Sequence, residues 1–231
     1  MTGRPDKRAI TSWAFYDFAN TIFSMNVISL YFALWVTVDH GGQDILYSLA
    51  LSGSMFAVAI SVPIFGAISD HTGRRQFPLT LLTLIAVIAT ALIGQTNQLG
   101  MGLCLFIIAN YCYQSALVFY NGMLPSVARH SSVGMISGYG VALGYVGSIA
   151  GLLLVKPFVA DGGRTAAFLP TATLFLIFSI PCFLFVKDPD PKPFQVDVGK
   201  AFRTLKKTIA DASQYHVLLK FIGIHFLILD V

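Results

Sequence analysis

Residues 76–128 read QFPLTLLTLIAVIATALIGQTNQLGMGLCLFIIANYCYQSALVFYNGMLPSVA, and the whole stretch contains no charged side chain. A helix that crosses the hydrocarbon core of a bilayer needs about 20 mainly apolar residues. The stretch is therefore too long for one transmembrane helix. The polar segment 96–100, TNQLG, divides it into two spans joined by a short loop.

The composition agrees with a membrane protein. The chain has 231 residues, of which 55% are hydrophobic and 11% are charged. Soluble domains carry about 25% charged residues, and a globule with so few charges could not cover its surface. The composition excludes a soluble enzyme, a secreted disulfide scaffold and a disordered chain. It predicts an all-α polytopic bundle of helices whose main partner is the lipid bilayer.

The gaps between charged residues place the other spans. Asp17 is the only charge between Ala9 and Val38, which predicts a first helix at about 13–38. Further charge-free stretches predict helices at 45–69, 133–155 and 165–186, with loops at 125–132 and 156–164. With the two helices inside 76–128, the sequence predicts six spans.

The composition changes after the sixth span. Residues 187–193, KDPDPKP, cannot be helical throughout and lie in water or at the interface. The spacing of apolar residues in 196–213 predicts an amphipathic helix on an anionic membrane face, or else a solvated connector. A last apolar run at 221–229 is too short to span. We therefore expect a six-helix domain at 1–187, a cytoplasmic linker at 188–215, and a truncated seventh transmembrane helix at 216–231.

The basic residues predict the orientation. Among 15 Lys and Arg residues, only Lys156 and Arg164 fall on the side of the bilayer opposite to the N-terminus. Lys and Arg gather in the cytoplasmic loops of membrane proteins. The N-terminus is therefore expected in the cytoplasm, with the chain in the cell membrane if the source is bacterial.

The loop at 66–75, GAISDHTGRR, carries the first functional motif. Gly66 permits close helix packing and Gly73 supplies a tight turn. Asp70, Arg74 and Arg75 place opposite charges at a helix junction, where they could form a cytoplasmic latch with another domain. The simpler alternative is a turn that only follows the positive-inside rule.

The loop resembles the G-x-x-x-D-R/K-x-G-R-R/K signature of the major facilitator superfamily, at the position where that superfamily carries it. The resemblance implies two six-helix halves that rock about a midplane site, so the chain would be the N-terminal half plus the start of helix seven. The missing C-terminal half would then be a partner. His71 departs from the signature, which usually has a base there, and could weaken one contact of the latch or make it pH-dependent.

Three segments resemble the vacuole-effluxer family more closely: WAFYDFANT at 13–21, FYNGMLP at 119–125 and ISGYGVALGYVG at 136–147. Fungal members of that family export amino acids from the vacuole. The resemblance covers essentially the whole chain but only half of the family's twelve-helix fold. It implies transport of an amino acid or a similar metabolite.

Polar residues inside the first and fourth spans are the candidate site. An ionisable residue within a span costs about 3 kcal/mol on insertion scales and usually faces a cavity or a partner. Asp17 and Asn20 share one face of the first helix, and the fourth presents Asn110, Gln114 and Asn121 on one stripe. The two helices hold corresponding places in the two triplets, where paired polar interruptions point to a substrate site. We expect substrate or proton coupling there. The alternatives are interhelical hydrogen bonds for the amides, and a structural or gating role for Asp17.

The fifth span carries glycines on one face, at Gly140, Gly144, Gly147 and Gly151. Such a face allows close backbone approach, for packing or for a sliding hinge.

The sequence as a whole predicts a secondary transporter for a small polar solute. A non-transporting sensor or receptor on the same scaffold is the alternative, and no helix carries the paired groups of a catalytic site. No metal spacing, cofactor motif or nucleic-acid motif is present, so no metal, cofactor or nucleic-acid partner is expected.

Overall fold

The computed structural model describes residues 7–128, 132–188 and 220, without the side chains at positions 68, 70 and 71. In chain order the elements are α1 (Lys7–Phe23), η1 (Ser24–Tyr31), α2 (Phe32–Leu34), η2 (Trp35–Asp39), α3 (Asp44–Thr72), α4 (Gln76–Ile93), α5 (Leu99–Val127), α6 (Val133–Gly162), η3 (Arg164–Ala167) and α7 (Phe168–Phe185). The first four elements follow one another without a break. Six helical segments of the described chain are therefore long and apolar enough to cross a membrane, which confirms the all-helical fold.

Several helices continue beyond their predicted ends. α5 includes Pro125, and α6 runs to Gly162, so the loop expected at 156–164 is wrong for most of its length. Lys156 and Pro157 lie inside α6. A charge marks the edge of the hydrocarbon core, but a helix can continue into water. One proline removes a single backbone donor and does not always end a helix.

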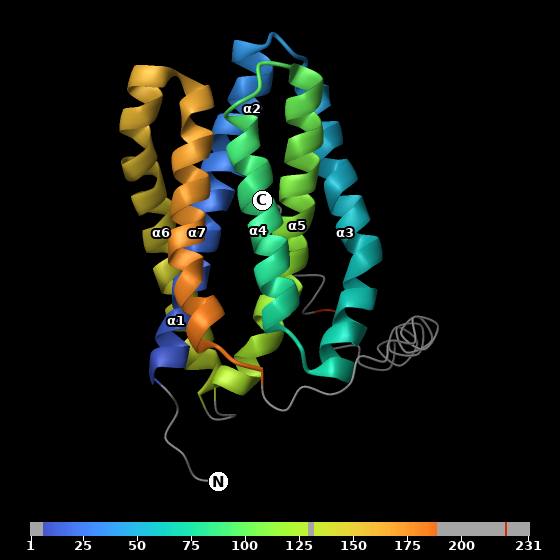
Figure 1. Cartoon of the computed structure of the whole chain (residues 1–231), viewed down its shortest axis with the longest axis vertical. Coiled ribbons are helices and arrows are strands. Elements are labelled where there is room, and N and C mark those ends of the chain that lie inside the picture. The colour runs from blue at the N-terminus through green and yellow to red at the C-terminus, as the bar shows by residue number, and fades with distance from the viewer. Residues whose placement is uncertain (1–6, 129–131, 189–219, 221–231) are drawn as a thin grey trace.

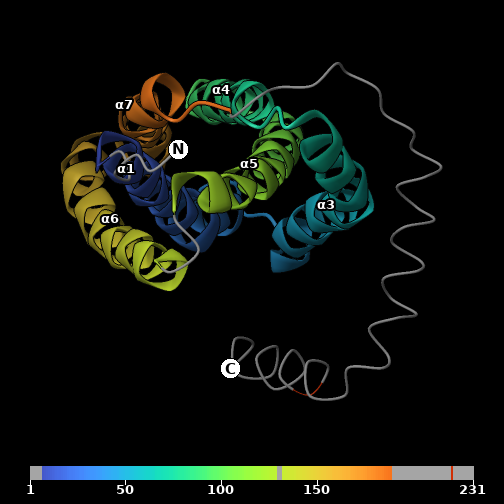
Figure 2. The same ribbon diagram turned by 90° about the horizontal axis from the view of Figure 1, so that it is seen from below.

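The helices form two groups of three. α1 packs against α6 and α7, while α5 packs against α3 and α4. α4 and α7 contact each other and join the two groups on one side of the bundle. Figures 1 and 2 show α3 and α6 at opposite ends of the bundle, with α1 and α5 between them.

Aromatic rings fill the contact between α1 with its continuation and α5. Three stacked pairs follow one another along it: Trp13 with Tyr120 at 4.6 Å between ring centroids, Phe23 with Tyr113 at 4.5 Å, and Phe32 with Phe106 at 4.1 Å. Stacked pairs stabilise by about 0.5–1.5 kcal/mol beyond the area they bury. The two central helices are thus fixed against each other along most of their length.

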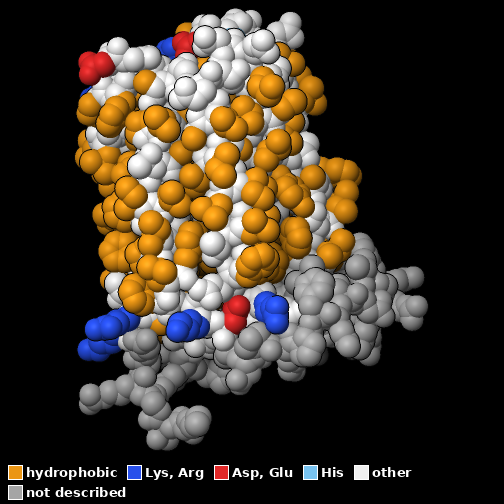
Figure 3. Space-filling view, viewed as in Figure 1, with side chains coloured by type: hydrophobic (Ala, Val, Ile, Leu, Met, Phe, Trp, Pro, Cys, Tyr) orange, Lys and Arg blue, Asp and Glu red, His pale blue; other side chains and the backbone are white. Residues whose placement is uncertain are grey.

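The outer surface is an apolar band with charges at its two ends (Figure 3). Large side chains such as Phe56, Tyr145 and Leu153 are 70%, 72% and 65% exposed. Such a continuous apolar surface would be unstable in water but suits contact with lipid. We call the end where α1 begins the Lys7 end, and the opposite end the Arg164 end.

Most of the predicted linker and seventh helix lies outside the described residues. Of the linker at 188–215, only Asp188 is described, and of the segment 216–231, only Lys220, which is helical and exposed. The amphipathic helix expected at 196–213 is likewise outside the described chain.

Candidate functional site

The glycine face of α6 lies directly against α1. All four glycines, Gly140, Gly144, Gly147 and Gly151, are buried. A Cβ atom added at Gly147 would lie 2.4 Å from the carbonyl oxygen of Phe18, and one at Gly151 would lie 3.2 Å from the Cα of Ile22. At Gly147 the two backbones therefore approach too closely for a larger residue, and at Gly151 the contact is tight. We call this contact the α1–α6 seam.

The carboxyl group of Asp17 lies in this seam. A Cβ atom at Gly144 would come 3.2 Å from Asp17 Oδ2, and one at Gly140 would come 3.5 Å from the same oxygen. Asp17 is half-buried. Within residues 7–128 and 132–188, no side chain forms a hydrogen bond or ion pair with the Asp17 carboxyl group. A carboxyl group without a partner inside a span favours taking up a proton or a cationic group.

Thr21 closes the seam one turn further along α1. Its hydroxyl donates to the carbonyl oxygen of Gly144, at 2.7 Å between the oxygens. The carbonyl oxygens of Phe18 and Asp17 lie 3.0 and 3.1 Å from the same hydroxyl. The hydroxyl has one proton for three acceptors, and the shortest distance links α1 to α6.

Two asparagine amides of the α1 run are buried with unused hydrogen-bonding atoms. Asn26 is fully buried and neither its Oδ1 nor its Nδ2 has a partner among the described residues. It lies beside Gly151, where a Cβ atom would be 3.2 Å from Asn26 Nδ2. Asn20 is 4% exposed, and its Oδ1 also has no partner in the described chain. An unused polar group in hydrocarbon costs several kcal/mol, so these amides are candidates for contact with a polar ligand or water.

The sequence analysis missed Asn26. At 100° per residue it lies about 180° away from Asp17 on an ideal helix, so it does not share the polar face. The structure is π-helical from Ser24 to Tyr31, and Asn26 lies in that segment. A π-helical segment inside a longer helix is rare and often marks a functional site.

The polar residues of α5 do not all face α1. Asn110 is fully buried and donates from Nδ2 to Ser54 Oγ on α3, at 2.7 Å. Asn110 thus contacts α3 through its Nδ2, while its Oδ1 has no partner among the described residues. Asp17 is turned to α6, and a common site for these residues stays a prediction. The helical periodicity shows which residues share a face, but not which neighbouring helix covers that face.

The other two amides of α5 are less enclosed. Gln114 is half-buried and Asn121 is exposed. Tyr113, next to Gln114 in the chain, is buried and stacks on Phe23 of α1 at 4.5 Å between ring centroids. A hydrogen bond between the first and fourth spans runs instead from Trp13 Nε1 to the carbonyl oxygen of Tyr120, at 3.3 Å.

The loop after α3 is held by local hydrogen bonds. Gly73 ends α3 with φ +62°, in the left-handed region that favours glycine. Arg75 donates from Nε to Ser69 Oγ at 2.8 Å and passes close to Gly122 of α5, where a Cβ atom would be 3.2 Å from Nε. Arg74 is exposed, and its backbone N–H donates to Thr72 Oγ1. Arg75 therefore fixes the loop, and Arg74 is available to another surface.

Gly66 does not have the packing role predicted for it in this loop. It was expected to allow close helix packing, but a Cβ atom there would meet nothing within 4 Å among the described residues. Gly66 faces away from the helices of this bundle, so the packing explanation is wrong within the described chain. The side chains of Asp70 and His71 lie outside the described residues, so the latch remains a prediction.

A contact that the sequence analysis missed anchors the same loop to α7. Both carboxylate oxygens of Asp188 lie 3.1 Å from the backbone nitrogen of Gln76, the first residue of α4. The side-chain amide of Gln76 also donates to the carbonyl oxygen of Phe183. A carboxylate at a helix N-terminus accepts unused N–H groups and interacts favourably with the helix dipole. No short motif marks this pair, because the two residues are far apart in sequence.

Comparison with known proteins points to one family. Residues 17–229 match the family model described as Major Facilitator Superfamily. An uncharacterized protein of Aquifex aeolicus is 31% identical over 198 residues, which cover 82% of this chain and 49% of that protein. An uncharacterized MFS-type transporter of Bacillus subtilis, YxiO, is 26% identical over 246 residues, which cover 95% of this chain and 56% of that protein. The chain spans about half the length of the curated relatives that it matches.

Proposed function

Because the chain belongs to the major facilitator superfamily, a family of membrane transporters and not of enzymes, we propose that residues 1–187 form the N-terminal half of a secondary transporter that works by alternating access. The match over residues 17–229 carries this proposal. The residues at 188–215 would be the linker, and those at 216–231 the start of a seventh transmembrane helix. A C-terminal half would complete the transport site.

The proposed cargo is a small polar solute, an amino acid or a similar metabolite. This part rests on the resemblance of segments 13–21, 119–125 and 136–147 to the vacuole-effluxer family. The buried amides of Asn20 and Asn26 support it chemically, because both donate and accept hydrogen bonds, as a zwitterionic solute requires.

Asp17 is the proposed coupling residue. Its carboxyl group lies in the span without a partner among the described residues, on the glycine face of α6. In that place it can exchange a proton or contact the ammonium group of a solute. Asn20, Gln114 and Asn121 are proposed as further solute contacts, whereas Asn110 is assigned to the α3–α5 contact.

We propose that the Lys7 end is cytoplasmic. The described basic residues at this end are Lys7, Arg8, Arg74, Arg75 and Lys187, whereas Lys156 and Arg164 lie toward the Arg164 end. This distribution follows the positive-inside rule. In this orientation the loop 66–75 would be cytoplasmic, where Asp70, Arg74 and Arg75 could latch onto the second half.

The test is uptake of radiolabelled amino acids into proteoliposomes containing the full-length protein that carries this sequence. We expect uptake that follows an imposed pH gradient, and loss of that dependence in Asp17→Asn with exchange of solute across the membrane retained. Asp44→Asn is the matched control, because Asp44 is exposed at the start of α3. If pH-driven flux is unchanged in Asp17→Asn, Asp17 is not the coupling residue and its role is structural.

The alternative function is a membrane sensor on the same scaffold. Saturable binding of a solute without any flux, in protein that remains folded, would favour the sensor over the transporter.

A further inference from the structure

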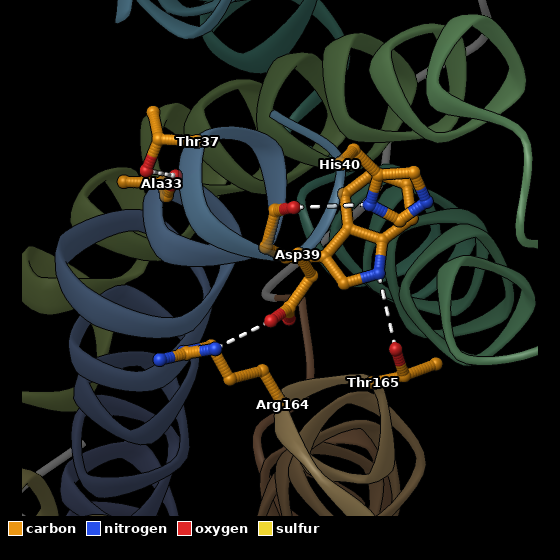
Figure 4. A network of polar contacts seen from close by, with 7 residues as sticks. Ala33, Thr37, Asp39, His40, Arg164 and Thr165 are labelled. Atoms are coloured by element: carbon orange, nitrogen blue, oxygen red, sulfur yellow. Dashed lines mark hydrogen bonds and ion pairs between the residues drawn. The ribbon is translucent and has the colours of Figure 1, made fainter. Parts of the chain in front are cut away.

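A group of hydrogen-bonded and ion-paired side chains lies at the Arg164 end of the bundle (Figure 4). Trp35 is fully buried, and a Cβ atom added at Gly102 would lie 2.3 Å from its ring. The indole Nε1 of Trp35 donates to Thr165 Oγ1 at 3.1 Å. Asp39 forms an ion pair with Arg164. These contacts join the end of the α1 run to α5 and to η3.

His40 adds a link that crosses between the two groups of helices. Its Nδ1 lies 3.0 Å from the carbonyl oxygen of Trp35, and its Nε2 lies 3.1 Å from the carbonyl oxygen of Asn97, in the turn between α4 and α5. The imidazole centroid is 4.0 Å from the Trp35 ring. Both ring nitrogens of His40 are thus engaged, and the imidazole is tilted by 48° to the indole plane.

Both partners of the imidazole are acceptors. A carbonyl oxygen carries no proton, so each ring nitrogen must donate to make a hydrogen bond. A neutral imidazole has one N–H group and the doubly protonated form has two. In the neutral form, one nitrogen lone pair would face a carbonyl oxygen. A charged ring over the indole face would also gain a cation–π interaction.

We infer that His40 is a pH-sensitive clasp: the doubly protonated ring ties the end of the α1 run to the α4–α5 turn, and the tie loosens when the ring loses a proton. The inference stands on the two carbonyl contacts and the indole contact. It depends on neither the substrate nor the direction of transport proposed above.

The charged groups around the clasp are few. Asp39 precedes His40 on η2 and is paired with Arg164 from η3. Asp44 begins α3, and the turn at 94–98 contains no charged residue. Since the Arg164 charge is compensated by Asp39, no unpaired cation on these elements opposes a charged His40 ring.

The test combines two measurements on the purified chain in lipid nanodiscs. Histidine titrates between about pH 5 and 8, so thermal unfolding is followed at about pH 5.5 and about pH 8. We expect His40→Gln to lower the midpoint by about 2–4 °C at the acid pH and by less than about 1 °C at the alkaline pH. Glutamine has one donor nitrogen where the doubly protonated ring has two on opposite sides, so it cannot donate to both carbonyl oxygens.

Thr165→Val is the matched control. It removes the acceptor of the Trp35 indole in the same group of contacts and should lower the midpoint equally at both pH values.

The second measurement is the nitrogen NMR spectrum of ¹⁵N-histidine-labelled chain, with the His40 signals assigned by their absence in His40→Gln. Two protonated ring nitrogens on His40 at about pH 5.5 are expected. A ring with only one N–H at that pH, or an equal loss of stability in His40→Gln at both pH values, would overturn the inference.

Discussion

Replacement of Gly147 by alanine should drive α1 and α6 apart. A Cβ atom at this position would lie 2.4 Å from the carbonyl oxygen of Phe18, 2.6 Å from the hydroxyl of Thr21 and 3.0 Å from the Cα of Phe18. Ordinary contact begins at 3.4 Å, so about 1 Å of movement is needed. Two of the three atoms belong to the backbone, so rotation of a side chain cannot relieve these contacts and the helices themselves must move.

The free-energy cost of this separation has two parts. Inserting a methyl group into a well-packed contact typically costs about 1–3 kcal/mol. Separation of the helices would also stretch the hydrogen bond from Thr21 to the Gly144 carbonyl, which contributes about 1 kcal/mol. A protein of this size loses about 2–4 °C of melting temperature per kcal/mol. We therefore expect Gly147→Ala to melt roughly 4–16 °C below wild type.

The assay is thermal unfolding in detergent, with Gly138→Ala as the matched control. Gly138 is on the same helix, and a Cβ atom there meets nothing within 4 Å among the described residues. Alanine is the better helix former, so the control should be as stable as wild type or slightly more so. The close approach of α1 and α6 is wrong if Gly147→Ala has the melting temperature of wild type, or if Gly147→Ala and Gly138→Ala lose the same stability.

Three further changes test other contacts by the same unfolding assay. Gly102→Leu should destabilise by about 3 kcal/mol or prevent folding, because the Trp35 ring occupies the space, and accumulation at wild-type yield would contradict that packing. Asp188→Ala should lower the free energy of unfolding by about 1 kcal/mol, because it leaves the N-terminus of α4 without its cap at Gln76. Asp188→Asn should keep part of the stabilisation, since the amide oxygen can still accept the hydrogen bond. An equal loss of stability in both variants would argue against capping. Asn110→Leu should destabilise by about 1–2 kcal/mol through loss of the bond to α3 and leave any solute binding intact, and a selective loss of binding would return Asn110 to the solute site.

The number and approximate position of the spans could be predicted, because charged side chains are costly in hydrocarbon and are therefore found mainly between the spans. The uncharged stretch 76–128 and the polar break at 96–100 were sufficient to predict α4 and α5. The ends of helices were less predictable, as α6 shows by continuing through Lys156 and Pro157. A helix that leaves the bilayer loses nothing by remaining helical in water.

The candidate site was only partly predictable, since it depends on which helix covers which face. The periodicity placed Asp17 on a polar face of the first helix and the four glycines on one face of α6. It could not show that the carboxyl group of Asp17 lies against Gly140 and Gly144. For Asn110 the covering helix turned out to be α3. Asn26 lies in a π-helical segment, which no residue pattern in the sequence marks.

Contacts between the two groups of helices bear on how the six helices would move. At the Lys7 end, Asp188 and Phe183 hold Gln76 of α4. In the middle, the hydroxyl groups of Tyr16 on α1 and Thr83 on α4 are bonded at 2.8 Å. At the Arg164 end, His40 contacts the carbonyl oxygen of Asn97.

These three links lie at different depths along the bundle, so a hinge between the two groups of helices would have to break at least one of them. Relative motion of the two groups of helices is therefore opposed within this six-helix unit. A single rigid unit is what rocking of two halves requires. Among the three links, the one made by a histidine is at the Arg164 end. By the clasp inferred above, a rise in pH would loosen the unit at that end, while the buried Tyr16–Thr83 bond is retained.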